Sequence, residues 1–191
     1  GLLGLLLLAR EPSLTVTGLE LSPAACALAD RTAAANGLTD RLITLPCDLR
    51  DRRQLPSAGR FDLAVSNPPY FPAGGGKTAA GSRGIHRAEL ACTMEQLCAA
   101  AAYLLRSGGQ FCLVYRTERL AELMETLRRH RLEPKVLRFV QKNAASAPSL
   151  LLMACRKDGG TGLTVQPPLL LQNDDGTETP ELRRIYFKEK G

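Results

Sequence analysis

The stretch Ser66-Asn67-Pro68-Pro69-Tyr70 follows the short apolar run Phe61-Asp62-Leu63-Ala64-Val65 and precedes a glycine-rich, basic segment. Two consecutive prolines donate no backbone hydrogen bonds, so a strand formed by the apolar run has to end here. Each proline also restricts the residue before it to extended geometry, which fixes the path of Asn67 and Pro68. The stretch therefore predicts a rigid strand end that presents a carboxamide, two carbonyls and an aromatic ring, suited to holding a flat group that carries an NH2.

Strand and helix patterns alternate on both sides of this stretch. Apolar runs predict strands at 14–21, 41–46, 61–66, 110–115, 135–140 and 149–155, and helical patterns cover 2–10, 23–36, 89–105 and 118–131. Such alternation is typical of an α/β fold with a mostly parallel sheet covered by helices on both faces. The glycines at 159, 160 and 162 mark a boundary, so we expect a domain at 1–158 and a tail at 159–191 that extends the same domain. The tail has a polar turn and a charged end at 181–190.

The composition is that of a soluble globular protein of one domain. The chain has 191 residues, of which 45% are hydrophobic and 23% charged, and no apolar run is long enough to span a bilayer or to form a convincing signal peptide. Its six cysteines include no Cys-x-x-Cys pair, and there are only two histidines. We therefore expect reduced core thiols, a cytoplasmic location and no metal site.

The formal net charge of +6 suggests an anionic partner, and its distribution is more informative. The segment from Phe71 to Ala88 contains Lys77, Arg83, His86 and Arg87 but no acidic residue. A solvated loop would explain this segment equally well. Beside a motif that can hold a base, phosphate contact is the favoured interpretation. Aromatic residues make up only 5% of the chain and Trp is absent, which disfavours a broad platform for stacking single strands.

Polar side chains follow three of the predicted strands. Glu20 closes the strand at 14–21, Asp48 lies just past the strand at 41–46, and Asn67 ends the strand at 61–66. Ligands of open α/β sheets bind outside the carboxyl ends of the strands. A strand-end acid can accept hydrogen bonds from both ribose hydroxyls, and the spacing from Gly1 to Glu20 is that of a glycine turn and such an acid. Asp48 could accept from an adenine amino group or merely cap the next segment. The three together favour a nucleoside-bearing cofactor.

The chain resembles the S-adenosylmethionine-dependent amino-methyltransferases. The resemblance lies in the order of four features: the glycine turn, Glu20, Cys47-Asp48 and Asn67-Pro68-Pro69-Tyr70. A closer resemblance is to the bacterial tRNA adenine-N6 methyltransferases that modify valine tRNA beside its anticodon. It lies in the motif and Phe71, the basic loop with His86-Arg87-Ala88-Glu89, Gly108-Gly109, Pro167-Pro168 and Arg183-Arg184-Ile185-Tyr186.

This resemblance implies a Rossmann-like class I methyltransferase whose last strand is antiparallel. It implies Asn67, Pro68 and Tyr70 as catalytic residues, with Tyr70 stacked on the target base. The resemblance implies that S-adenosylmethionine is bound by Gly1, Glu20, Leu21, Asp48, Leu49 and Asn67, with Glu20 at the ribose and Asp48 at the adenine. It also implies that tRNA is bound by the loop 71–88, and names as substrate-binding residues Pro69, Phe71, Lys77, Arg83, His86 and Arg87.

The chain departs from the family at its start. Gly1-Leu2-Leu3-Gly4 stands where the family has a strand and an Asp-x-Gly-x-Gly turn, so we expect that strand and most of the turn to be missing and the chain to be a fragment. Three rivals remain: a glutamine-N5 methyltransferase acting on a release factor, a DNA adenine methyltransferase, and a non-catalytic RNA-binding domain with a degenerate cofactor pocket. The particular tRNA, the nucleotide position and the oligomeric state are left open by the sequence.

Overall fold

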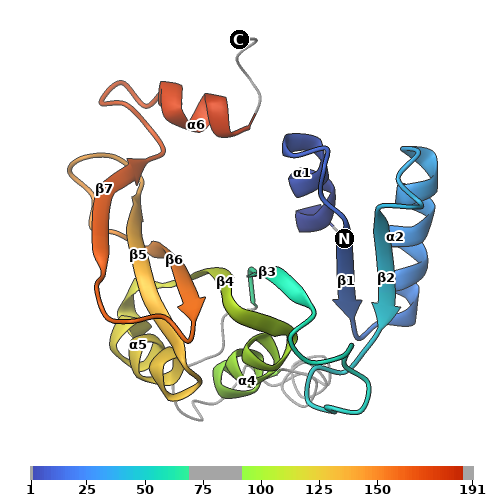
Figure 1. The fold of residues 1–191 in the computed structure, drawn as a ribbon. Coiled ribbons are helices and arrows are strands. Elements are labelled where there is room, and N and C mark those ends of the chain that lie inside the picture. Colours follow the sequence, from blue (N-terminus) through green and yellow to red (C-terminus); the bar gives the residue numbers. More distant parts are fainter. Residues whose placement is uncertain (1, 69–91, 187–191) are drawn as a thin grey trace, which may run out of the picture. The chain divides into compact units, whose positions relative to one another are not determined.

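The computed structural model describes residues 2–68 and 92–186, which divide into two compact units, Gly1–Ser57 and Ala58–Gly191 (Figure 1). Each unit has a sheet of its own, with two strands in the first and five in the second.

The smaller unit alternates helices and strands as the sequence predicts. Its elements are α1 (Leu2–Arg10), β1 (Val16–Glu20), α2 (Pro23–Ala35) and β2 (Leu42–Pro46). The two strands are parallel, with Val16 opposite Leu42 and Glu20 opposite Pro46. The core consists of Leu8, Ala33 and Leu42, surrounded by the partly buried Leu5, Leu14, Val16 and Leu38.

Local sequence signals mark both ends of α2. Ser22 is the N-cap, and its hydroxyl accepts a hydrogen bond from the Ala25 amide at 3.4 Å, with Pro23 at the first helical position. Beyond the C-terminal end, Gly37 has a φ of +64°, the left-handed conformation expected of a glycine that ends a helix.

The larger unit contains a mixed five-stranded sheet with helices packed against it. Its elements are β3 (Phe61–Ser66), α4 (Met94–Leu104), β4 (Leu105–Arg116), a short 3-10 turn η1 (Thr117–Arg119), α5 (Leu120–Arg129), β5 (Leu132–Gln141), β6 (Leu150–Lys157), β7 (Thr164–Leu170) and α6 (Pro180–Ile185). The strand order is β3-β4-β6-β5-β7. Helix α4 packs on β4 and α5, α5 packs on β5, and α6 lies beyond the end of β7 (Figure 1).

The pairing pattern gives each strand of this sheet a direction. Strand β3 is parallel to β4, and β5 is parallel to β7. Strand β6 is antiparallel to both β4 and β5, as expected for the strand predicted at 149–155, so β4 and β5 run the same way. The carboxyl ends of β3, β4, β5 and β7 therefore lie at one edge of the sheet, which we call the carboxyl edge. The opposite edge is called the amino edge.

The core of the larger unit is formed by side chains of β4, β5, β6, α4 and α5. Its largest fully buried members are Tyr115, Phe111, Leu105, Leu123, Leu127, Leu132, Leu151, Met153, Cys98 and Cys155. All six cysteines of the chain lie in the part that the structure describes, and none forms a disulfide. Burial raises the pKa of Cys98 to about 12 and also raises that of Cys155, so both behave as protonated core thiols. No helix within residues 2–68 and 92–186 has the length and apolar character needed to cross a membrane.

The structure differs from the sequence prediction most clearly at α4, β4 and the tail. Helix α4 begins at Met94 because Thr93 and Gln96 form a capping box, in which each side chain accepts a hydrogen bond from the other residue's backbone amide. Strand β4 begins at Leu105 and includes the Gly108-Gly109 pair that was expected to precede it. The tail adds the strand β7, so the strand predicted at 149–155 is not the last of the sheet.

Gly109 allows β3 and β4 to pair closely. A Cβ at this position would lie 2.9 Å from the Arg106 carbonyl oxygen and 3.2 Å from that of Asp62. Both contacts are with backbone atoms, which cannot rotate away as the end of a side chain can. The β3–β4 register also shifts here, from Phe61 opposite Leu105 to Leu63 opposite Gln110.

We predict that Gly109→Ala lowers the free energy of unfolding by about 1–3 kcal/mol, because overpacking against fixed backbone forces the strands to shift. Urea denaturation followed by circular dichroism measures the change. Gly160→Ala is the matched control, since nothing lies within 4 Å of the added methyl group there, and it should change stability by less than about 0.5 kcal/mol. Equal effects of the two substitutions would contradict the role of Gly109.

Candidate active site

The two acids expected at the cofactor lie at the ends of neighbouring strands in the smaller unit. Glu20 is the last residue of β1 and stands opposite Pro46, the last residue of β2. The next backbone hydrogen bond runs from the Cys47 amide to the Glu20 carbonyl at 2.9 Å, so Asp48 follows one residue later. The parallel register thus brings Glu20 and Asp48 to the same edge of this sheet.

Glu20 is oriented by the start of the following helix. Its Oε1 accepts a hydrogen bond from the Ser22 amide at 2.9 Å, and Ser22 is the N-cap of α2. A carboxylate at a helix N-terminus is stabilised by the helix dipole. Because an ionised carboxylate can accept about four hydrogen bonds, Glu20 retains capacity for a pair of ribose hydroxyls. Leu21, its neighbour, is exposed.

Asp48 forms a two-pronged ion pair with Arg50. The Arg50 Nη2 lies 2.7 Å from Asp48 Oδ2 and the Nε lies 2.9 Å from Oδ1, while the Arg50 amide also donates to Oδ1 at 2.9 Å. The hydrogen bonds from Arg50 hold the pKa of Asp48 below its ordinary value. The Asp48 amide donates to Gln54 Oε1 at 3.0 Å, which fixes the backbone. The carboxylate is therefore ionised and pre-oriented, with its side chain 24% exposed. Leu49 is half-buried beside it.

Cys47, which precedes Asp48, is buried and has a structural role. Burial is the main reason that its pKa is raised, and the nearby Asp48 and Asp51 raise it further. A thiol with a raised pKa is a weak nucleophile, so Cys47 is unsuited to covalent catalysis.

Asn67 and Pro68 belong to the larger unit and follow β3 at its carboxyl edge. Ser66, the last residue of β3, pairs with Leu113 of β4, which fixes where the chain leaves the sheet. The Asn67 side chain is exposed and Pro68 is buried. Because its ring fixes φ, the buried proline makes a stiff support for the carboxamide before it.

The end of β4 lies next in the strand order along the carboxyl edge. Thr117 ties the turn between β5 and β6 to this end, because its Oγ1 donates to the Pro148 carbonyl at 2.8 Å and its amide to the Ser149 carbonyl at 3.4 Å. The end of β4 on this edge is therefore fixed by hydrogen bonds to the turn between β5 and β6.

The remaining predicted site residues lie outside the described residues. These are Gly1 for the cofactor, Tyr70 for catalysis, and Pro69, Phe71, Lys77, Arg83, His86 and Arg87 for the substrate. Their assignments stay predictions.

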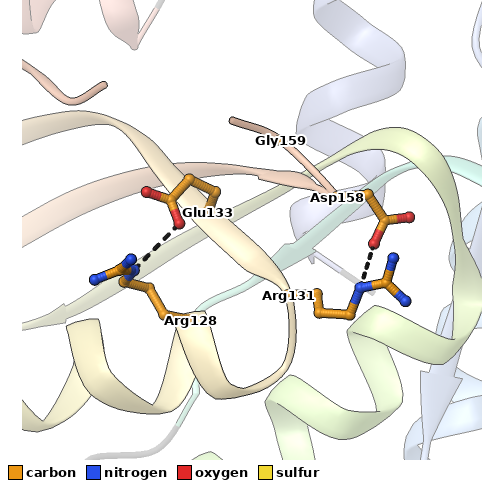
Figure 2. A pocket seen from close by; sticks show the side chains of 5 residues that line it. All are labelled: Arg128, Arg131, Glu133, Asp158 and Gly159. Carbon is orange, nitrogen blue, oxygen red and sulfur yellow. Dashed lines mark hydrogen bonds and ion pairs between the residues drawn. The ribbon is translucent and has the colours of Figure 1, made fainter. Parts of the chain in front are cut away.

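A cavity of about 390 Å³ lies at the amino edge of the larger unit (Figure 2). It is lined by Arg128, Arg131, Glu133, Asp158 and Gly159, with ion pairs joining Arg128 to Glu133 at 3.3 Å and Arg131 to Asp158 at 2.9 Å. Because Leu132 pairs with Lys157 at this end of the sheet, the cavity lies at the opposite edge from Asn67. Because of this position, the cavity cannot hold a substrate that contacts Asn67.

Two contacts of Asp48 were not predicted from the sequence. The place of Arg50 two residues after Asp48 is a local signal for an ion pair within a turn. Gln54 lies six residues beyond Asp48 and gives no comparable signal. In the part of the chain that the structure describes, no group of three or more His, Cys, Asp or Glu side chains could hold a metal ion.

Strands alternate with helices in both units, with Glu20 and Asp48 at and just past strand ends of the smaller unit and Asn67-Pro68 after β3 of the larger one. This arrangement is that of a Rossmann-like class I methyltransferase fold. A solved structure from Agrobacterium tumefaciens, titled as a predicted O-methyltransferase, has the same fold, with a TM-score of 0.77 and 20% identity over 95% of this chain and 81% of that one. The chain belongs to the family of the methyltransferase small domain, whose model matches residues 1–140.

Two relatives with named activities are similar to the chain. A protein of Porphyromonas gingivalis named tRNA1(Val) (adenine(37)-N6)-methyltransferase is 30% identical over 190 residues, which cover 97% of this chain and 74% of the relative. A release factor glutamine methyltransferase of Chlorobaculum tepidum is 30% identical over 135 residues, which cover 66% of this chain and 46% of the relative. The first similarity includes the β7 and α6 region, whereas the second spans a smaller part of the chain.

We predict that Arg50→Gln raises the pKa of Asp48 toward its ordinary value, because the substitution removes the hydrogen bonds from the guanidinium. A depressed folded-state pKa stabilises the fold above the unfolded-state pKa, and this contribution is lost as the pH falls through the folded value. Titration of the side-chain carboxyl carbons by NMR measures the shift.

Arg53→Gln is the matched control, since hydrogen bonds from Arg53 lower the pKa of Asp51 to about 2. This variant should move the Asp51 titration and leave that of Asp48 in place. An unchanged Asp48 titration in Arg50→Gln would show that another group sets its pKa.

Proposed function

We propose that this chain transfers a methyl group from S-adenosylmethionine to N6 of an adenine in tRNA, beside the anticodon of a valine tRNA. The observation that carries the proposal is the exposed Asn67 with the buried Pro68 at the carboxyl end of β3, in a chain of a methyltransferase family. The named activity of the Porphyromonas gingivalis relative supports adenine N6 as the acceptor. With tRNA as partner, the protein would act in the cytoplasm.

Glu20 and Asp48 have the chemistry needed to hold the nucleoside of the cofactor. Glu20 has one oxygen bound to the Ser22 amide at 2.9 Å and further acceptor capacity for the two ribose hydroxyls. Asp48 is kept ionised by Arg50 and can accept a hydrogen bond from an exocyclic NH2 of adenine. When bound, S-adenosylmethionine supplies a methyl group activated by its sulfonium.

Asn67 and Pro68 would prepare the acceptor nitrogen. The lone pair of an adenine N6 is delocalised into the ring, so the amino group is a poor nucleophile. Acceptance of its two hydrogens by the Asn67 Oδ1 and the Pro68 carbonyl favours a pyramidal nitrogen and stabilises the positive charge that develops during transfer. The stiff Asn-Pro backbone holds both acceptors in place, so much of the remaining rate enhancement comes from positioning.

A glutamine-N5 methyltransferase acting on a release factor is the second candidate, because an amide NH2 suits the same two acceptors. The similarity to the Chlorobaculum tepidum protein favours it, but that similarity covers 66% of this chain. A non-catalytic RNA-binding domain is a candidate of another class. Calorimetry with S-adenosylmethionine separates it from the two enzymes, since such a domain would bind RNA without binding the cofactor.

The test is methyl transfer from labelled S-adenosylmethionine to total tRNA, followed by digestion to nucleosides. We expect the label in N6-methyladenosine. A parallel reaction with purified release factor checks the second candidate, and label in protein rather than in RNA would overturn the assignment to tRNA.

We predict that Asn67→Ala lowers the single-turnover rate of methyl transfer by roughly 10²–10³-fold, the usual effect of removing one group that stabilises developing charge. The dissociation constant of S-adenosylmethionine should change little, because we assign Asn67 mainly to the acceptor nitrogen and expect Glu20 and Asp48 to supply most of the cofactor contacts. Stopped-flow or quench-flow kinetics gives the rate, and calorimetry gives the affinity.

Glu20→Ala is the matched comparison and should have the reverse pattern. Loss of hydrogen bonds to a charged group weakens cofactor binding by roughly 10–100-fold, while the rate at saturating cofactor falls much less. If Asn67→Ala weakened cofactor binding as much as it slowed transfer, Asn67 would be a cofactor or folding residue instead.

A further inference from the structure

The chain after β7 returns to the carboxyl edge, the edge at which Asn67 lies. Strand β7 is parallel to β5, and β5 runs in the direction of β3 and β4, so Leu170 ends at this edge. Residues 171–186, here called the C-terminal arm, continue through a tight turn at Asn173–Thr177 into α6. Figure 1 shows α6 beyond the end of β7.

Backbone hydrogen bonds hold the first part of the arm against the sheet. The Leu171 amide donates to the Gln141 carbonyl at 3.0 Å, and the Gln172 amide donates to that of Lys142 at 2.8 Å. Thr179 then closes the turn, because its hydroxyl donates to the Leu170 carbonyl at 2.7 Å. The same hydroxyl accepts from the Leu182 amide at 3.2 Å and so caps α6.

An ion pair with two parallel hydrogen bonds fixes α6 to β5. The Nη1 and Nη2 of Arg138 donate to the two carboxylate oxygens of Glu181, each at 2.7 Å, and the Arg138 Nε donates to the Pro167 carbonyl at 2.9 Å. The Arg138 side chain is only 20% exposed. Fork-to-fork pairing of this kind restricts orientation as well as distance, so the arm is preordered on the sheet.

The arm exposes a group of residues suited to RNA. Arg183, Arg184 and Tyr186 are exposed in and directly after α6, and the Tyr186 side chain is 59% exposed. Among residues 2–68 and 92–186, Tyr186 is the only exposed Phe or Tyr, and Trp is absent from the chain. Guanidinium groups bind phosphates through two hydrogen bonds, and an exposed ring can stack on a base.

We propose that the C-terminal arm is a second RNA contact, with Arg183 and Arg184 on phosphates and Tyr186 against a base or ribose. Strand β7 is four strand spacings from β3, or about 19 Å at ~4.8 Å each. That span corresponds to about six stacked nucleotides at ~3.4 Å each, so the arm meets a part of the RNA other than the methylated adenine. The inference rests on tRNA being the substrate, and it assigns the arm to substrate affinity and not to chemistry.

The first test compares the double variant Arg183→Glu/Arg184→Glu with the wild-type chain in binding to a transcribed valine tRNA. Fluorescence anisotropy gives the dissociation constant at several salt concentrations. We expect binding at low salt to weaken at least tenfold and the slope of log K against log salt to fall by roughly 1.4–1.8, because each of the two lost phosphate contacts lowers it by about 0.7–0.9. Tyr186→Ala should weaken binding with little change in slope.

The matched control is Arg128→Glu/Arg131→Glu at the cavity of the amino edge. It makes the same change of charge on the same unit, at two arginines that line the cavity (Figure 2). The strand pairing places this cavity at the opposite edge. Affinity should stay within about twofold of wild type. Equal weakening by the control and the arm variant would overturn the proposal, since net charge alone would then explain both.

Glu181→Gln tests whether the arm has to be anchored. The substitution removes a negative charge, so electrostatics alone would strengthen RNA binding. Loss of the fork with Arg138 releases α6, so the proposal expects binding severalfold weaker with both arginines intact. Stronger binding by Glu181→Gln would overturn the anchoring role.

A methylation assay separates failure of this inference from failure of the proposed function. If the wild-type chain binds and methylates tRNA while Arg183→Glu/Arg184→Glu binds equally well, only the arm proposal is wrong. If the wild-type chain neither binds nor methylates tRNA, both fall. At saturating tRNA the arm variant should reach a transfer rate within about threefold of wild type, and a much larger loss of rate would assign the arm to catalysis.

Discussion

Close pairing of β3 with β4 is the constraint on which the larger unit depends. In the part of the chain that the structure describes, β3 joins the sheet through β4 alone, and a Cβ on Gly109 would lie 3.2 Å from the Asp62 carbonyl oxygen, closer than an ordinary contact. The same pairing sets Ser66 opposite Leu113 and so decides where the chain leaves the sheet toward Asn67 and Pro68. Gly109, which has no side chain, thus helps to set the position of the Asn67 carboxamide at the end of the neighbouring strand.

Two carboxylates near the proposed functional residues are each held by an arginine. Asp48 is held by Arg50 and Glu181 by Arg138, and in both cases hydrogen bonds from the arginine lower the pKa of the carboxyl group. These carboxylates are oriented, and their charge is compensated locally. Arg183 and Arg184 lie exposed beside the second pair. Such pairing reduces the repulsion that acidic residues would otherwise exert on a polyanion. It neutralises two arginines, but the chain keeps a formal net charge of +6.

Local patterns predicted most of the fold, and non-local contacts account for the rest. The alternation of strands and helices, the Ser22-Pro23 helix start, the Gly37 stop and the strand end at Asn67 were all readable from neighbouring residues. The strand β7 was not, because its run Thr164–Leu170 contains two prolines and pairs with a segment about thirty residues earlier. Glu20 and Asp48 were placed correctly at strand ends. The partner of Glu181 could not be found from the sequence, since Arg138 lies 43 residues away and nothing local relates the two.

The two prolines that made β7 unlike a strand in the sequence have a further effect on the sheet. Strand β7 is the outermost strand beyond β5, and its side chains are mostly exposed. Unprotected outer strands invite pairing with another copy of the chain, which leads to aggregation or exchange of segments. Pro167 and Pro168 have no N–H, so β7 lacks a donor that an incoming strand would need, and the Pro167 carbonyl already accepts a hydrogen bond from Arg138. The segment that closes the sheet on this side therefore also discourages its growth into a larger assembly.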